Sequence, residues 1–167
     1  LFEKSSEKRK PEIKRILGEA YYNENKFKEA IPHLNYYLEA KETKPTRSDN
    51  YIMGFCQYQT GSYTKALEYL KNVIEQPDSL SQNSYFIIGD CYIKTNQKQY
   101  ASNAFYEAYK INIDQEITEE ALFNYAKLQY EFSSNPFQSA ISSFEEYVNT
   151  FPNSQRIDEV NEYLLTI

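Results

Sequence analysis

Three glycines at nearly equal spacing are the strongest constraint on what this chain can fold into. Gly18, Gly54 and Gly89 are separated by 36 and 35 residues. The chain contains only four glycines in 167 residues, so three of them in register form a marked regularity. A period of this length is typical of chains in which one supersecondary unit is repeated. The spacing therefore predicts a repeat array and not a fold with one irregular core.

Two more positions recur in register with these glycines. An alanine follows each glycine after twelve residues, and a large apolar residue comes four residues later. These pairs are Ala30 and Leu34, Ala66 and Leu70, and Ala101 and Phe105. A fourth unit has Ala126 in place of the glycine and continues with Ala140 and Phe144, each two residues late. The extra residues fall in the turn sequence at 133–136, where an insertion costs little.

Each unit contains two segments of helical length. Apolar residues recur in them at intervals of three and four, and few Gly or Pro interrupt them. The first helices are expected at 11–24, 47–60, 82–95 and 118–132, and the second helices at 27–40, 63–76, 98–111 and 136–150. A small anchor residue lets adjacent helices approach closely. A bulky residue at Ala66 or Ala101 should therefore overpack its helix pair, which costs about 1–3 kcal/mol.

The residues around the anchors resemble a known repeat signature. The anchor has an apolar residue before it and a tyrosine after it in the first and third units, as Leu17, Gly18 and Tyr21, and as Ile88, Gly89 and Tyr92. Pro152 closes the fourth unit. With the later alanine and its apolar partner, this pattern resembles the tetratricopeptide repeat over about residues 11–152, although the signature tryptophan is absent.

The resemblance implies an all-α fold, a right-handed α–α superhelix or solenoid of about four helix-turn-helix repeats with partial units at both ends. The repeats are expected at 11–46, 47–81, 82–117 and 118–152. Residues 1–10 are expected to end a preceding helix, and residues 153–167 to form the first or capping helix of a further repeat. Asn153 or Ser154 is the expected cap of that last helix.

The charge and composition of the chain disfavour several classes of partner. A net charge of -6 and a pI near 5.0 disfavour nucleic acid and anionic lipid, because both select a concentrated Lys/Arg surface. No apolar run approaches the roughly 20 residues that cross a bilayer, so no direct membrane insertion is expected. The compartment stays open between cytoplasm and periplasm.

The residues that could carry chemistry are few. His33 is alone, so it is expected to be a surface or packing residue and not part of a metal site. Cys56 and Cys91 occupy equivalent positions of adjacent units, where helices 8–10 Å apart exceed disulfide reach, and we expect two buried thiols. Glu119 and Glu120 are explained by the dipole at a helix start. The sequence therefore predicts a chain without an active site, metal or cofactor.

Helical rotation separates two faces of the first helices. Leu17, Ala20 and Tyr21 and their equivalents are expected to pack against neighbouring helices. A second, roughly opposite face has twelve members, and seven of these are aromatic. Aromatic rows on a groove wall suit a protein segment, because they offer large contact areas at low entropy cost. The candidate protein-binding residues are Tyr22, Asn23, Tyr51, Phe55, Tyr58, Phe86, Asp90, Lys94, Phe123, Lys127 and Tyr130.

Two functions remain open on these grounds. The first is a non-catalytic protein–protein interaction module that binds a peptide or helical segment of a partner in its concave, aromatic-rich groove. The alternative is an architectural solenoid segment of a larger assembly protein, for example of a bacterial cell envelope, in which the rings only pack successive repeats. Weak self-association through the terminal helices is also expected, because Val160, Leu164 and Ile167 need covering.

Overall fold

The computed structural model describes residues 2–132 and 136–167. These residues form nine α-helices and no strand, and they divide into unit 1, residues 1–75, and unit 2, residues 76–167. No helix among them is long and apolar enough to span a membrane. The insertion expected at 133–136 lies largely outside the described residues.

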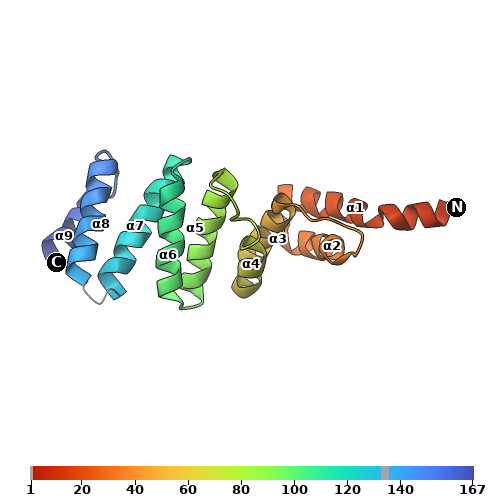
Figure 1. The fold of residues 1–167 in the computed structure, drawn as a ribbon, viewed down its shortest axis with the longest axis horizontal. Coiled ribbons are helices and arrows are strands. Elements are labelled where there is room, and N and C mark those ends of the chain that lie inside the picture. The colour runs from red at the N-terminus through yellow and green to blue at the C-terminus, as the bar shows by residue number, and fades with distance from the viewer. Residues whose placement is uncertain (1, 133–135) are drawn as a thin grey trace. The chain divides into compact units, whose positions relative to one another are not determined.

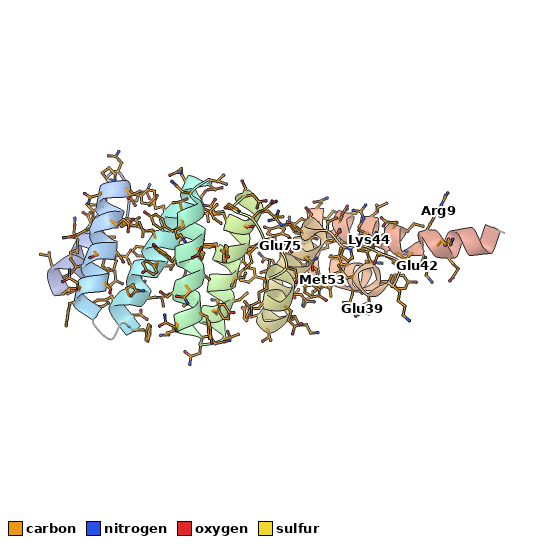
Figure 2. The ribbon with its side chains drawn as sticks, in the orientation of Figure 1. Arg9, Glu39, Glu42, Lys44, Met53 and Glu75 are labelled. Atoms are coloured by element: carbon orange, nitrogen blue, oxygen red, sulfur yellow. The ribbon has the colours of Figure 1, made fainter. Side chains whose placement is uncertain are left out.

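Unit 1 contains four helices that pack in chain order (Figure 1). They are α1 (Phe2–Asn23), α2 (Phe27–Glu39), α3 (Arg47–Gln59) and α4 (Tyr63–Leu70). Each helix packs on the next, and α1 also touches α3. The core of this unit contains Ala30 and Leu34 of α2 with Met53 and Cys56 of α3. Figure 2 shows Met53 among these helices, whereas Arg9 projects from the side of α1.

Unit 2 repeats the same arrangement with five helices. They are α5 (Ser79–Lys94), α6 (Lys98–Ile111), α7 (Gln115–Phe132), α8 (Pro136–Thr150) and α9 (Ile157–Thr166). Consecutive helices lie side by side in Figure 1, and α5 also touches α7. In a helical solenoid, each helix pair stacks on the next and contacts only its neighbours along the chain. The expected all-α solenoid class is therefore confirmed.

The turns inside the helix pairs share one backbone conformation, although only one of them contains glycine. Asn25, Gly61 and Asn96 each have a positive φ, between 57° and 79°. The N–H of the residue after each donates to the carbonyl five residues back, as from Lys26 to the Tyr21 carbonyl at 2.8 Å. This is the Schellman end of a helix, in which Gly or Asn tolerates the left-handed backbone. Asparagine therefore serves in two turns where glycine serves in the third.

The glycines of the first helices lie where two helices touch. A Cβ placed on Gly89 would lie 2.7–2.9 Å from three ring atoms of Phe105, and Gly18 and Gly54 face Leu34 and Leu70 at similar separations. The large apolar residue that follows each recurring alanine therefore packs directly on the anchor of its own unit.

Gly89→Val is expected to lower the free energy of unfolding by about 1–3 kcal/mol, because the Phe105 ring is buried and must move to admit the new side chain. Urea unfolding followed by far-ultraviolet circular dichroism measures this change. Gly61→Asn is the matched control, since nothing lies within 4 Å of a Cβ there and Asn tolerates its positive φ. Equal stability of the valine variant and the native chain would refute the close-packing role.

Two helices begin earlier than the periodicity predicted. The start of α5 is Ser79 and not residue 82, because the Asp78 carboxylate accepts a hydrogen bond from the Ser81 N–H at 2.9 Å. The start of α7 is Gln115 and not residue 118, because Asp114 accepts from the N–H groups of Glu116 and Ile117 at 3.0 and 3.2 Å. Both aspartates satisfy backbone donors that a helix start leaves open. Side-chain capping therefore added about one turn to each helix.

The expected helix at 63–76 is shorter, and the expected break before Pro11 is absent. The second helix of the second pair, α4, ends at Leu70. Beyond it the chain turns so that Val73 is buried and its carbonyl accepts from the Arg47 Nε at 2.7 Å. In contrast, α1 runs unbroken through Pro11, although proline removes a helical donor there. Residues 2–10 therefore belong to the first helix and are not a separate preceding one.

The expected packing of Leu17 and Ala20 was wrong. Both side chains are exposed, as are Ile13 and Ile16 on the same helix. Among the described residues α1 touches only α2 and α3, so this side of α1 has no neighbouring helix to cover it. The equivalent residues Met53 and Cys56 of α3 are fully buried, as predicted.

The last helix is held by a polar cluster and not by a simple cap. The first turn of α9 is preceded by Arg156, so neither Asn153 nor Ser154 is its N-cap residue. The Ser154 hydroxyl instead accepts from the Arg156 N–H at 3.0 Å and donates to Glu119 at 2.5 Å. Val160 then lies fully buried in the core of unit 2. The residues before α9 therefore fix its position through side chains of α7.

Candidate functional site

The predicted binding residues of unit 1 form a connected cluster of rings. Tyr22 and Tyr51 lie with ring centroids 5.7 and 6.0 Å from Phe55, and Tyr58 lies 6.4 Å from it. Phe27 of α2 packs on the same Phe55 ring at 5.6 Å. All five side chains are half-buried. Much of their surface is therefore used inside unit 1, which supplies a structural reason for the aromatic row there.

Two predicted polar residues, Asn23 and Lys94, do not line either of the two pockets described below. Asn23 is exposed at the end of α1, and Lys94 is exposed at the end of α5. Neither side chain lines a described cavity with the other predicted residues. The structure therefore separates these two positions from the rest of the candidate set.

Three predicted residues of unit 2 meet in one pocket of about 240 Å³ between α5, α6 and α7. They are Phe86 and Asp90 of α5 and Lys127 of α7. The other lining residues come from the same three helices and are Ile93, Lys98, Phe105, Asn124, Leu128 and Glu131. We call this cavity the α5–α7 pocket. Its residues lie far apart in sequence, and helix packing alone brings them together.

The α5–α7 pocket has an apolar floor. The Phe105 ring and the Leu128 side chain are buried, and the Phe86 ring meets Phe105 edge-on with centroids 5.4 Å apart. An edge-to-face pair of this kind is a favoured aromatic geometry and holds both rings in place. The floor is therefore a preformed apolar surface of fixed shape.

Charges of both signs surround that floor. Lys98 pairs with Glu131 at 3.4 Å, and its Nζ lies 3.9 Å from the centroid of the Phe132 ring. The Asn124 amide donates to a backbone carbonyl of its own helix, at Glu120, which leaves the side-chain oxygen as an acceptor. Ion pairs this exposed contribute little to stability. They are instead suited to polar atoms of a bound chain at the rim.

The Phe123 ring is buried, whereas the sequence placed it on the open groove face. The side chain is 3% exposed and packs on Tyr147 at 5.8 Å. Arg156 and Lys127 cover the ring from outside, with the guanidinium carbon at 4.4 Å and the Nζ at 5.3 Å from its centroid. The sequence placed Phe123 on this face of α7 without considering the link that precedes α9. The link before α9 closes that surface.

A second pocket, of about 360 Å³, lies between α7 and α9 and contains the last predicted residue, Tyr130. Its other lining residues are Glu159, Glu162, Tyr163 and Thr166. We call it the α7–α9 pocket. Sequence reasoning missed these four because the two faces were sorted only for the four full repeats and not for the helix expected at 153–167. The sequence did contain a signal for Glu162. If Val160 is aligned with Ala121, Glu162 takes the position of Phe123, which belongs to the predicted binding face.

The two cysteines and the histidine pack against other side chains of the fold. Cys56 and Cys91 are buried free thiols, as predicted, and burial raises the pKa of each to about 12. His33 stacks on the Tyr21 ring with centroids 5.4 Å apart, and the Lys14 Nζ lies 3.4 Å from its Nδ1. No group of three or more potential metal ligands occurs within residues 2–132 and 136–167. These residues therefore pack the fold.

Glu119 and Glu120 have a role other than the helix-dipole role predicted for them. The Glu119 carboxylate accepts from the Tyr147 hydroxyl at 2.7 Å as well as from Ser154, and Glu120 pairs with Arg156. Burial is the largest cause that raises the pKa of Tyr147 to about 12, and this carboxylate adds to it. Since α7 begins at Gln115, both glutamates lie beyond its first residues. They hold the link that precedes α9.

Comparison with known families gives two matches. Residues 23–108 match the family model described as anaphase-promoting complex, cyclosome, subunit 3, and residues 120–154 match the tetratricopeptide repeat model. No curated protein matches the chain. Tetratricopeptide repeats generally mediate protein–protein interaction, and proteins of this family are typically non-catalytic scaffolds. With about half of the chain in one match and a repeat model in the other, the chain belongs to the tetratricopeptide repeat family.

Proposed function

We propose that this chain is a non-catalytic interaction module that binds a peptide or helical segment of a protein partner through the α5–α7 pocket. The observation that carries the proposal is the meeting of Phe86, Asp90 and Lys127 over a buried apolar floor. Anchoring side chains in binding interfaces characteristically fill such pockets, with polar contacts around them. The acidic net charge supports a protein partner over nucleic acid.

The size of the α5–α7 pocket suits one large side chain. A closed cavity of about 150 Å³ holds a benzene molecule, so an open one of about 240 Å³ accommodates a leucine, methionine or phenylalanine side chain of the partner. The Asn124 oxygen and the rim charges then lie beside the partner's backbone. The proposal is therefore one apolar anchor held at a polar rim.

We also propose the repeat boundaries 11–46, 47–81, 82–117 and 118–152, with 153–167 as the first helix of a further repeat. Equivalent turns at Asn25, Gly61 and Asn96 support this division, because they recur with the same period as the anchors. The α7–α9 pocket supports the last assignment, since a first helix contributes to the same face as α5 and α7.

Ile93→Trp tests the binding proposal because it fills the α5–α7 pocket from its half-buried edge. Peptides selected from a displayed random library on the native chain are expected to lose at least about tenfold in affinity for this variant, as for a blocked anchor pocket. Ile113→Trp, at an exposed position of the same unit, is the matched control and should bind them unchanged. Fluorescence anisotropy at several chain concentrations measures both, and also tests the weak self-association expected through the terminal helices. Val160, Leu164 and Ile167 pack in the core of unit 2, so that association would use exposed residues such as Ile16 and Leu165.

The architectural alternative is favoured by one observation, the ring cluster of unit 1, which uses its aromatics internally. It predicts a different result in the same experiment. Selected peptides would bind the native chain, Ile93→Trp and Ile113→Trp equally, or none would be selected at all. Either result would remove the α5–α7 pocket as a binding site and leave the chain as a spacer segment.

A further inference from the structure

The α7–α9 pocket differs in chemistry from the α5–α7 pocket. Its walls are two phenol rings, Tyr130 and Tyr163, and two carboxylates, Glu159 and Glu162. Thr166 is the fifth lining residue, and among the residues that the structure describes no lysine or arginine lines the pocket. In contrast, the α5–α7 pocket carries equal numbers of acidic and basic residues. One acidic and aromatic cavity therefore lies beside one whose charges balance, with α7 between them.

The aromatic wall of this pocket is held rigidly. The Tyr163 ring stacks on Phe144 with centroids 4.9 Å apart and planes within 8° of parallel, and Phe144 is fully buried. Tyr130 then meets Tyr163 at 5.5 Å with an interplanar angle of 64°. Because the stack on the core fixes Tyr163, the two rings present a preorganised corner. Binding to such a corner costs little side-chain entropy.

The two carboxylates are not neutralised by the protein. Glu159 and Glu162 are exposed and three residues apart, so they lie on one side of α9. Within the part of the chain that the structure describes, neither has an ion-pair or hydrogen-bond partner. Arg156, just before α9, is occupied by Glu120 and by the face of Phe123. Two like charges beside aromatic rings therefore leave a negative, cation-attracting pocket.

We propose that the α7–α9 pocket binds the guanidinium group of an arginine side chain from the partner segment. A guanidinium is planar and always charged, donates several N–H groups in a fork that matches carboxylates, and stacks on aromatic faces. The pocket offers both complements, and its volume of about 360 Å³ admits the group with some water. A lysine ammonium lacks the planar fork, so it should bind more weakly.

This inference rests on the proposed function, because the arginine would belong to the segment that fills the α5–α7 pocket. Lys127 and Glu131 of α7 line one pocket, and Tyr130 of the same helical turn lines the other. A partner chain that crosses α7 can therefore place an apolar side chain on one side and an arginine on the other. The two pockets together therefore select a partner segment in which an apolar residue and an arginine lie close together in the sequence.

The test uses three small probes on the whole 167-residue chain. N-acetylarginine amide, N-acetyllysine amide and N-acetylnorleucine amide are titrated while amide NMR shifts are followed. The arginine probe is expected to shift the amides of Tyr130 and of residues 159–166, with the lysine probe weaker and the neutral probe without effect. Glu159→Gln with Glu162→Gln should weaken arginine binding by roughly 5- to 10-fold, the scale of two exposed charge contacts.

Matched controls separate this site from general charge effects. Glu68→Gln with Glu145→Gln removes the same charge from exposed positions outside the pocket and should leave arginine binding within about twofold. Tyr130→Leu removes one ring and should weaken the arginine probe several-fold. Amide spectra of each variant that keep the native dispersion establish that the fold is intact.

Several outcomes would overturn the proposal. Equal binding of norleucine, shifts confined to other helices, or no effect of the double glutamine variant would each refute the site, and lysine binding as tightly as arginine would refute the guanidinium assignment. The proposed function fails separately. If the arginine probe binds as expected but selected peptides ignore Ile93→Trp, the α7–α9 site stands and the α5–α7 pocket does not.

Discussion

Phe144→Ala should lower the free energy of unfolding of unit 2 by about 3–5 kcal/mol, the range for removing a buried phenylalanine ring. Phe144 has no exposed surface and lies at the centre of a core with Tyr147 and Val160. Its ring also stacks on Tyr163 of α9 at 4.9 Å. The substitution therefore opens a cavity and removes the contact that docks the last helix. Urea unfolding followed by circular dichroism measures the loss.

Phe137→Ala is the matched control for that substitution. Phe137 lies on the same helix, α8, and is 55% exposed, so its removal should cost under about 1 kcal/mol. Hydrogen exchange adds a local readout, because the amides of α9 should exchange faster in Phe144→Ala than in Phe137→Ala. Similar stabilities of the two variants would contradict the placement of Phe144 in the core.

Gln82→Leu should lower the free energy of unfolding by about 2–4 kcal/mol, because it removes a buried side chain that makes four hydrogen bonds to the loop and to Thr118. The Gln82 side chain is fully buried in α5 and binds the loop between α6 and α7. Its oxygen accepts from the N–H groups of Ile113 and Asp114 at 3.3 and 2.8 Å. Its nitrogen donates to the Asp114 carbonyl at 3.1 Å and to Thr118 at 2.9 Å. Leucine keeps the volume and supplies none of these bonds.

The loss for Gln82→Leu is measured by urea unfolding, with Gln97→Leu as the control. The Gln97 side chain is exposed and donates to the Thr95 hydroxyl at 3.0 Å in a surface turn, so its change should cost less than about 0.5 kcal/mol. The amides of Ile113 and Asp114 should also exchange faster with solvent in Gln82→Leu. A loss below 1 kcal/mol with unchanged exchange would show that the loop is held by other contacts.

The helix pattern was predictable because it depends on local periodicity. The segment predicted at 98–111 is α6 over the same residues, and 27–40 and 47–60 each differ from α2 and α3 by one residue. Differences arose where side chains compete for the backbone at a helix end. Asp78 and Asp114 extended their helices, and the Arg47 bond to Val73 accompanies the early end of α4. Such contacts depend on three-dimensional placement that periodicity does not contain.

The candidate site was only partly predictable. Rotation around a single helix correctly grouped Phe86 with Asp90, since both lie on one face of α5 and line one pocket. The same rule placed Phe123 on that face, yet the link to α9 buries it. Five of the eight other residues that line the pocket with Lys127 come from α5 and α6, which rotation around α7 cannot supply. The face on which a residue lies can be predicted from its own helix, whereas a pocket depends on how at least two helices pack.

The spacing of Gly18, Gly54 and Gly89 determined by itself that this chain is a helical repeat array, because the same small residue is needed wherever the same two helices touch. Tertiary structure alone decided which side chains remain available. It enclosed Phe123, engaged Arg156 with Glu120, and left Glu159 and Glu162 beside two tyrosine rings. The reason is physical: periodicity specifies the direction of a side chain, but its exposure and its charge partners depend on the helices packed beside it.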